Sequence, residues 1–205
     1  YGGARNFVGF TRAPKRNKSY DTDGDGMPAS KQKWSRRVLV QLIRLMQKSL
    51  IKYQYRMISK LKLDDGELLF LNYGYYDADT QALPLTPEEE PFRAAIHLYH
   101  RTAAHGDPAG KDVLEVGCGR GGGAAYIMRA LQPRSMTAVD LCKSGIEFCR
   151  RHFAASGVQY EVGDAEALPF DDAEFDVIVN VESSHCYPKL MLFLNDVKRV
   201  LRPGG

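Results

Sequence analysis

The feature of this sequence that most constrains its fold is an apolar run that ends in a cluster of glycines, VLEVGCGRGGG at residues 113–123. The apolar run predicts a buried strand, and the glycines let the following turn bring its backbone close to a ligand at the N-terminus of a helix. Gly117, Gly119 and Gly122 have the GxGxxG spacing that many nucleotide-binding domains share. The motif therefore predicts a nucleotide site without saying which nucleotide it holds.

Strands and helices alternate after this motif. The apolar runs predict strands at residues 112–116, 136–139, 159–162 and 175–180, and helical patterns lie between and after them at residues 122–131, 144–156 and 189–201. Alternation of this kind is typical of an α/β fold with a doubly wound parallel sheet, in which ligands bind at the carboxyl ends of the strands. Four strands leave such a sheet incomplete, so we expect its C-terminal strands to be missing from this chain.

The charges divide the chain into two parts. Residues 1–62 hold 15 Lys and Arg but 3 Asp and Glu, whereas the remainder of the chain holds 13 and 22. We expect residues 1–34, which are basic and polar, to be disordered. Residues 35–63 predict a basic amphipathic helix, because apolar residues recur at three- and four-residue steps beside a row of cations. We then expect residues 64–110 to form an N-terminal cap with one helix. We expect residues 111–205 to form the ligand-binding α/β domain.

The basic helix leaves two interpretations open. It can lie on an anionic membrane surface, which would make residues 35–62 a peripheral membrane contact, or it can be a solvated helix that packs on the domain or serves as a linker. No nucleic-acid-binding module is recognisable, so we expect no nucleic-acid partner. Four scattered cysteines without a CxxC pair favour a reduced protein of the cytoplasm, with membrane association as the open alternative.

Three carboxylates at the predicted strand ends discriminate between nucleotides. Glu115 precedes the first glycine of the motif by two residues, Asp140 ends the second strand, and Asp164 follows the third. A carboxylate beside the glycine turn would repel a pyrophosphate, whereas it would attract a cofactor that carries a sulfonium and a free amino group. S-adenosylmethionine has both groups and no phosphate. A nicotinamide-dependent oxidoreductase, whose cofactor carries a pyrophosphate, is one alternative, and a non-catalytic binding module with a nucleotide-binding fold is another.

At these residues the chain resembles the class I S-adenosylmethionine-dependent methyltransferases, which match VLEVGCGRGGG, VDLCKSGIEFCR, GDAEALPFDDAEFDVIVNVESSHCYP and VKRVLRPGG in order and spacing. In LNYGYY and EEEPFRAAIHLYHRTA it is most similar to the phthiotriolone/phenolphthiodiolone dimethyltransferases, which methylate lipid hydroxyls, and to sterol and natural-product methyltransferases. The resemblance implies a Rossmann-like fold, S-adenosylmethionine as cofactor, and methyl transfer to a small-molecule or lipid-like acceptor, with oxygen the favoured target.

The resemblance also implies the residues that surround the methionine part of the cofactor. Gly117 and Gly119 would line it, with Glu115 supporting its amino group, and Asn180 would lie near the same end. Two aromatic residues of the N-terminal segment would close over the cofactor, namely Tyr73 and Tyr75.

The adenosine part has its own implied residues. Asp140 would hold the ribose hydroxyls, and Leu141 would pack on the adenine ring. Asp164 and Ala165 would recognise the edge of the adenine.

A hydroxyl acceptor has to lose a proton, which calls for a general base with a pKa near neutrality. His185 is the leading candidate because it follows the fourth predicted strand and imidazole titrates in that range. Glu182 is the second candidate. The alternative interpretations are a hydrogen-bonded loop histidine that shapes the pocket and a carboxylate that anchors a turn. No grouping of His, Cys and Asp has the spacing of metal ligands, so we expect no metal.

Overall fold

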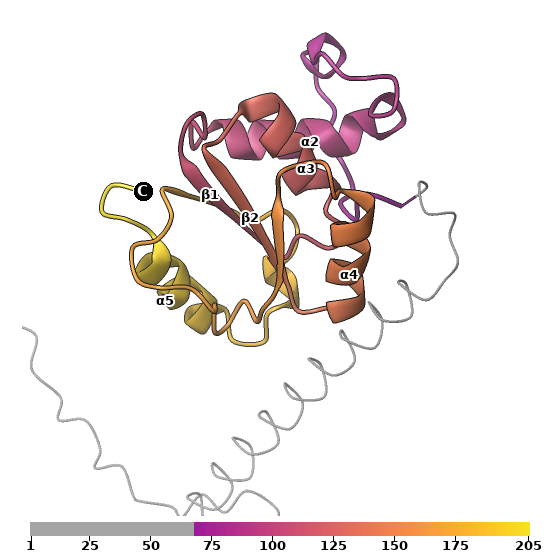
Figure 1. The fold of residues 1–205 in the computed structure, drawn as a ribbon. Coiled ribbons are helices and arrows are strands. Elements are labelled where there is room, and N and C mark those ends of the chain that lie inside the picture. The colour runs from indigo at the N-terminus through magenta and orange to yellow at the C-terminus, as the bar shows by residue number, and fades with distance from the viewer. Residues whose placement is uncertain (1–67) are drawn as a thin grey trace, which may run out of the picture. The chain divides into compact units, whose positions relative to one another are not determined.

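The structure, a computed structural model, describes residues 68–205. The segments predicted to be disordered (1–34) and helical (35–63) lie outside these residues. Within them, four parallel strands form one sheet in the order β3–β2–β1–β4, with helices on both faces (Figure 1). The predicted doubly wound α/β fold is confirmed.

The strands of the sheet lie close to their predicted positions. They are β1 (Asp112–Val116), β2 (Ser135–Asp140), β3 (Gln159–Val162) and β4 (Val177–Val179). β1 and β3 have the predicted bounds, and β2 is longer by one residue at each end. β4 is shorter than predicted by two residues at its start, where Phe175 forms an isolated bridge with Leu201, and by one at its end, where the side chain of Asn180 donates to the carbonyl of Val116.

The helices also follow the predicted order. They are α2 (Arg93–Ala104), α3 (Gly122–Leu131), α4 (Lys143–His152) and α5 (Leu190–Val200), with short 3-10 helices η1 (Thr80–Ala82), η2 (Glu90–Phe92) and η3 (Ser184–Cys186). α4 ends four residues before the predicted end, because the Ser156 hydroxyl donates to the carbonyl of Phe153 and closes a turn there. No helix within the described residues is long and apolar enough to cross a membrane.

β1 separates two apolar cores, because successive side chains of a strand point to opposite faces. Val113 belongs to a core shared with α2, α3 and α4, whereas Leu114 and Val116 belong to a second core shared with α5. Glu115 lies between Leu114 and Val116 on the face of Val113 and is fully buried. The helix of the N-terminal cap, α2, therefore forms part of the main core of the domain.

The amino ends of β1 and β4 are joined by a network of ion pairs. Arg202 donates to Asp112 at 2.9 Å and to Asp176 at 2.8 Å, and Arg134 pairs with both carboxylates. Hydrogen bonds from Arg134 and Arg202 hold the pKa values of Asp112 and Asp176, respectively, below their ordinary value. The amino edge of the sheet is thus neutralised by its own residues.

Candidate functional site

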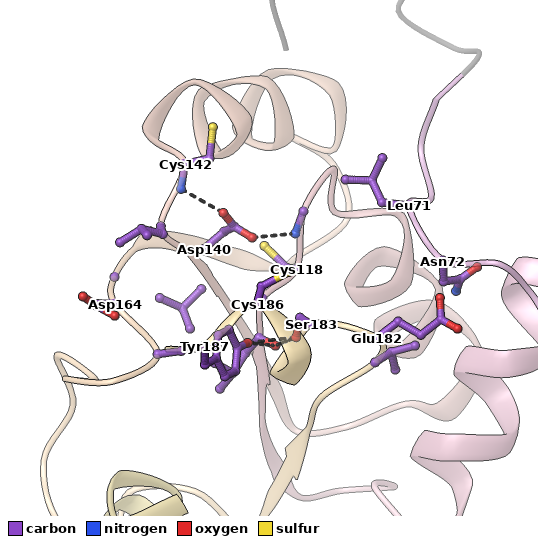
Figure 2. Close-up of a pocket in the computed structure, with 18 of the residues that line it drawn as sticks. Leu71, Asn72, Cys118, Asp140, Cys142, Asp164, Glu182, Ser183, Cys186 and Tyr187 are labelled. Carbon is purple, nitrogen blue, oxygen red and sulfur yellow. Dashed lines mark hydrogen bonds between the residues drawn. The ribbon is translucent and has the colours of Figure 1, made fainter. Parts of the chain in front are cut away.

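A pocket of about 550 Å³ opens at the carboxyl edge of the sheet (Figure 2). Its walls come from every strand end and from the N-terminal cap. They include residues 116–119 at the end of β1, residues 139–144 at the end of β2, residues 163–166 after β3, residues 181–183 and 186–188 after β4, residues 69–72, Tyr99 of α2 and Glu147 of α4. We call residues 69–72 the strap, because this part of the N-terminal cap runs along the rim of the pocket.

The glycine turn lines the pocket as predicted. Gly117 and Gly119 have φ angles of 81° and 57°, in the left-handed region that favours glycine. A Cβ on Gly117 would lie 2.4 Å from the hydroxyl oxygen of Ser183, so this position also has no room for a side chain. The turn thereby brings bare backbone to the pocket.

Asp140 lies at the end of β2 with its carboxylate directed along the pocket wall. Its two oxygens accept the N–H of Gly119 at 2.9 Å and the N–H of Cys142 at 2.8 Å (Figure 2). Burial raises the pKa of Asp140, and no Lys or Arg of the described residues forms an ion pair with it. The carboxylate can accept further hydrogen bonds from a pair of ribose hydroxyls. Leu141 lines the pocket beside it.

Asp164 and Ala165 lie in the pocket wall at the end of β3. One oxygen of Asp164 accepts the N–H of Glu166 at 3.0 Å, which fixes the carboxylate at the rim. Because β3 and β2 are neighbours in the sheet, the structure brings Asp164 and Asp140 to the same end of the pocket. Two carboxylates placed in this way can accept hydrogen bonds from the ribose hydroxyls and the adenine amino group of an adenosine.

Glu115 lies outside the pocket wall, one layer behind the glycine turn. It is fully buried, and one of its oxygens accepts the Tyr99 hydroxyl at 2.8 Å, while the other has no partner among the described residues. Burial raises the pKa of Glu115 to about 7. Tyr99, which sequence reasoning missed, lines the pocket in its place.

Asn180 also lies behind the wall and positions two residues that do line it. Its Nδ2 atom is 2.7 Å from the Ser183 hydroxyl, 3.0 Å from the Tyr187 hydroxyl and 2.9 Å from the carbonyl of Val116. Ser183 and Tyr187 were not among the predicted site residues, although the polar run VESSHCYP contains both.

The two tyrosines predicted to close over the cofactor are placed elsewhere. The Tyr73 residue is 97% exposed, and Tyr75 stacks on His97 with ring centroids 5.7 Å apart. The chain leaves the pocket at Gly74, whose φ of 77° turns it toward α2, where the Tyr75 N–H donates to Ala94. The strap residues before this turn line the pocket instead.

The strap also occupies the N-terminus of α3. The carbonyl of Leu69 accepts the N–H of Gly122 at 3.2 Å, and the Phe70 ring lies against the same glycine. In dinucleotide-binding domains the helix N-terminus is where the pyrophosphate binds. Here that end of the helix is covered by protein, which disfavours the dinucleotide alternative.

The two candidates for the general base differ in position. Glu182 lines the pocket, has a φ of 48°, and accepts the Tyr73 N–H at 2.8 Å. A non-glycine residue in this region is strained, and such strain is often found at functional sites. His185 is exposed in η3 and lies outside the pocket wall of the described residues. Both catalytic roles stay predictions.

Comparison with known proteins agrees with this geometry. Residues 113–205 match the family model described as a methyltransferase domain. The phthiotriol/phenolphthiotriol dimycocerosates methyltransferase of Mycobacterium tuberculosis is 49% identical over 75% of this chain and 57% of its own length. The fatty-acid O-methyltransferase of Mycolicibacterium smegmatis is 43% identical over 89% of this chain and 65% of its own length.

The chain thus spans about three-fifths of the length of these curated relatives. Among solved structures, the cyclase SpnF has the same fold, with a TM-score of 0.59 and 20% identity over 76% of this chain and 57% of that one. The parallel sheet, the glycine turn and the family match together show that residues 113–205 form a methyltransferase domain with the class I fold, for which S-adenosylmethionine is the expected cofactor.

Proposed function

We propose that this protein transfers a methyl group from S-adenosylmethionine to an oxygen atom of a lipid-like acceptor. The proposal rests on the uncompensated carboxylate and the covered helix end at the carboxyl edge of the sheet. Asp140 has no cationic partner among the described residues, and the strap covers the helix end that a phosphate would use. Such an edge favours a positively charged nucleoside without phosphate.

The order of the strands supports one orientation of the cofactor. Asp164 at β3 would hold the adenine and Asp140 at β2 the ribose, so the methionine part would reach the glycine turn after β1. This leaves the loop after β4, with Glu182, for the acceptor. The pocket residues then have to position the acceptor oxygen and exclude water.

S-adenosylmethionine supplies a methyl carbon that its sulfonium already activates, so the remaining chemical task is to take the proton of a hydroxyl acceptor. Glu182 is supported by its place in the pocket wall. His185 is supported by the pH range of imidazole and by its place in the same loop. A carboxylic acid acceptor is already ionised at neutral pH and needs no base.

The lipid-like acceptor is supported by the relatives. One is named for phthiotriol and phenolphthiotriol dimycocerosates and another for fatty acids. We further propose that residues 35–62 touch an anionic membrane surface in the cytoplasm, which would bring the protein to its lipid. Co-sedimentation with phosphatidylglycerol vesicles tests this contact, and binding equal to that of neutral phosphatidylcholine vesicles would contradict it.

The experiment that tests the function uses the full-length protein. We expect saturable calorimetric binding of S-adenosylmethionine and none of NADH. Incubation with a long-chain alcohol or fatty acid should then give a product heavier by one CH₂ group in mass spectrometry. Binding of NADH in place of S-adenosylmethionine would support the oxidoreductase alternative, and cofactor binding without any methylated lipid would contradict the acceptor class.

A further inference from the structure

Nine large apolar side chains are exposed among the described residues, and all of them lie in segments that border the pocket at the carboxyl edge of the sheet. Four belong to the strap and the residues just after it, four to the first half of α5, and one, Val162, ends β3 directly before the pocket wall. Because α5 follows a strand of a parallel sheet, its first turn lies at the carboxyl edge. Single exposed apolar residues are ordinary, but a set confined to one edge indicates an interaction surface.

The first group, which we call the cap group, consists of Leu71, Tyr73, Tyr75 and Tyr76. Leu71 is itself part of the pocket wall (Figure 2). The N–H of Tyr73 donates to Glu182 of the opposite wall at 2.8 Å, which fixes this residue beside the pocket. Tyr73 is 97% exposed and Tyr76 is 64% exposed. Tyrosine has an apolar ring and a polar hydroxyl, so it suits the boundary between an apolar phase and water.

The second group, which we call the α5 group, consists of Leu190, Met191, Leu192 and Leu194. The N–H of Lys189 donates to Glu166 of the pocket wall at 2.7 Å, which fixes the start of α5 beside the pocket. Phe193 and Val200 bury the inner side of the helix, so the fold of the described residues does not need apolar residues on its outer side as well. Met191 is nevertheless 66% exposed.

The position of the two groups indicates what covers them. Both border the pocket, so a partner that covers them also covers the way in. A folded protein in this place would close the pocket to an acceptor, whereas a lipid layer would supply one. The pocket of about 550 Å³ has the size that one small-molecule ligand needs, and the cofactor is such a ligand. The hydrocarbon of a lipid acceptor therefore has to remain outside, where these side chains are.

The charges of the pocket wall indicate how the contact is made. Five acids and one lysine line the pocket. An acidic wall repels anionic headgroups, so charge does not hold this edge on a lipid surface. Burial of the exposed apolar side chains is the contribution that remains.

We propose that the cap group and the α5 group dock the carboxyl edge on a lipid surface, so that the pocket opens toward the lipid that contains the acceptor. This inference rests on the lipid-like acceptor of the proposed function. It is separate from the membrane contact proposed for residues 35–62, because that contact depends on charge, which salt screens, whereas this one depends on apolar area.

The test is flotation of the full-length protein with phosphatidylcholine vesicles in about 1 M NaCl, where the Debye length is about 3 Å. We expect the wild-type protein to float, and Met191→Ser and Tyr73→Ser each to weaken its partitioning about tenfold, because each removes a large apolar contact. Both variants should keep the wild-type affinity for S-adenosylmethionine in calorimetry, since neither side chain is part of the pocket wall. Glu174→Ser removes an exposed side chain before the amino end of β4 and is the control, which should float like the wild type.

Three outcomes would contradict these expectations. Wild-type protein that does not float in high salt would overturn the proposal, and so would equal flotation of the wild type and both variants. A wild-type dimer in analytical ultracentrifugation that both variants dissociate would assign the edge to a second copy of the chain, and would also overturn it. Failure of the wild type to bind S-adenosylmethionine, by contrast, would overturn the proposed function. The two variants lie in different segments, so the misfolding of one leaves the other as a test.

Discussion

The two edges of the sheet carry the same kind of side chain in opposite electrostatic states. At the amino edge, Asp112 and Asp176 share Arg134 and Arg202, and their pKa values lie below the ordinary value. At the carboxyl edge, burial raises the pKa values of Glu115 and Asp140, and neither carboxyl has a cationic partner among the described residues. The amino edge uses its acids to hold the strands together, whereas the acids of the carboxyl edge are not neutralised by any cation of the described residues.

Mutations at the two edges should therefore change different properties. Those at the carboxyl edge should change activity and cofactor affinity, and those at the amino edge should change stability.

The largest effect is expected where a side chain takes part in the chemistry. In the full-length protein, Glu182→Gln or His185→Asn, whichever removes the base, should lower kcat for a hydroxyl acceptor about a hundredfold or more without weakening S-adenosylmethionine. Glu174→Gln, in an exposed loop outside the pocket wall, is the matched control. If both variants keep wild-type kcat, the base is another residue.

The next effect concerns the cofactor. Asp140→Ala removes the carboxylate proposed to bind the ribose and should weaken S-adenosylmethionine about a hundredfold in calorimetry, because hydrogen bonds to a charged acceptor are among the stronger ones. Asp172→Ala removes an acid whose side chain is 79% exposed and should leave the affinity unchanged. An equal loss in both variants would mean that general charge, rather than the carboxyl edge, attracts the cofactor.

A smaller effect should appear in the pH dependence of stability. The folded pKa of Glu115 is about 7 against an ordinary 4.5, so the folded protein binds a proton that the unfolded chain releases between these values. The contribution of Glu115 to stability is present below pH 4.5 and is lost as the pH rises to 7. Glu115→Gln keeps an acceptor for Tyr99 and has no charge. Between pH 5 and pH 8, the free energy of unfolding of wild type should therefore fall by on the order of 2 kcal/mol relative to that of Glu115→Gln. Parallel pH curves for the two proteins would contradict the buried-acid interpretation.

The smallest effect is expected at the amino edge. Arg202→Met removes a partly exposed partner of two aspartates and should lower Tm by a few degrees at low salt, with a smaller difference at high salt. Because the pKa values of these aspartates are lowered, the stability they contribute is lost in acid, opposite to the behaviour of Glu115. Cofactor affinity at neutral pH should stay as in wild type. A loss of affinity would show that the two edges are not independent.

The parts of the site that follow from topology could be predicted from the sequence. Asp140 and Asp164 stand at strand ends, and parallel strands bring their carboxyl ends to one edge, so the spacing alone placed both in the pocket. Glu115 is predicted to support the cofactor directly, whereas it is buried one layer behind the pocket wall, where it accepts the Tyr99 hydroxyl.

The contributions of the cap could not be predicted in the same way. Asn72 and Tyr99 reach the pocket through contacts between segments far apart in the sequence, and no local pattern indicates such packing. The tyrosines of LNYGYY were expected to cover the pocket, yet the turn at Gly74 directs them to α2 and leaves that place to the residues before it. Ser183 and Tyr187 depend in the same way on the bonds that Asn180 makes.

The last two glycines of VLEVGCGRGGG show that a glycine in a nucleotide-binding motif does not always face a ligand. Gly122 accommodates Leu69 and Phe70, and Gly123 accommodates the Tyr99 ring, so both make room for another stretch of the same polypeptide instead of for a ligand. An alanine at either position would push the cap outward and distort the cofactor site from a distance. In this protein the second half of a nucleotide-binding signature accommodates the N-terminal segment, which covers the helix end where a phosphate would otherwise bind.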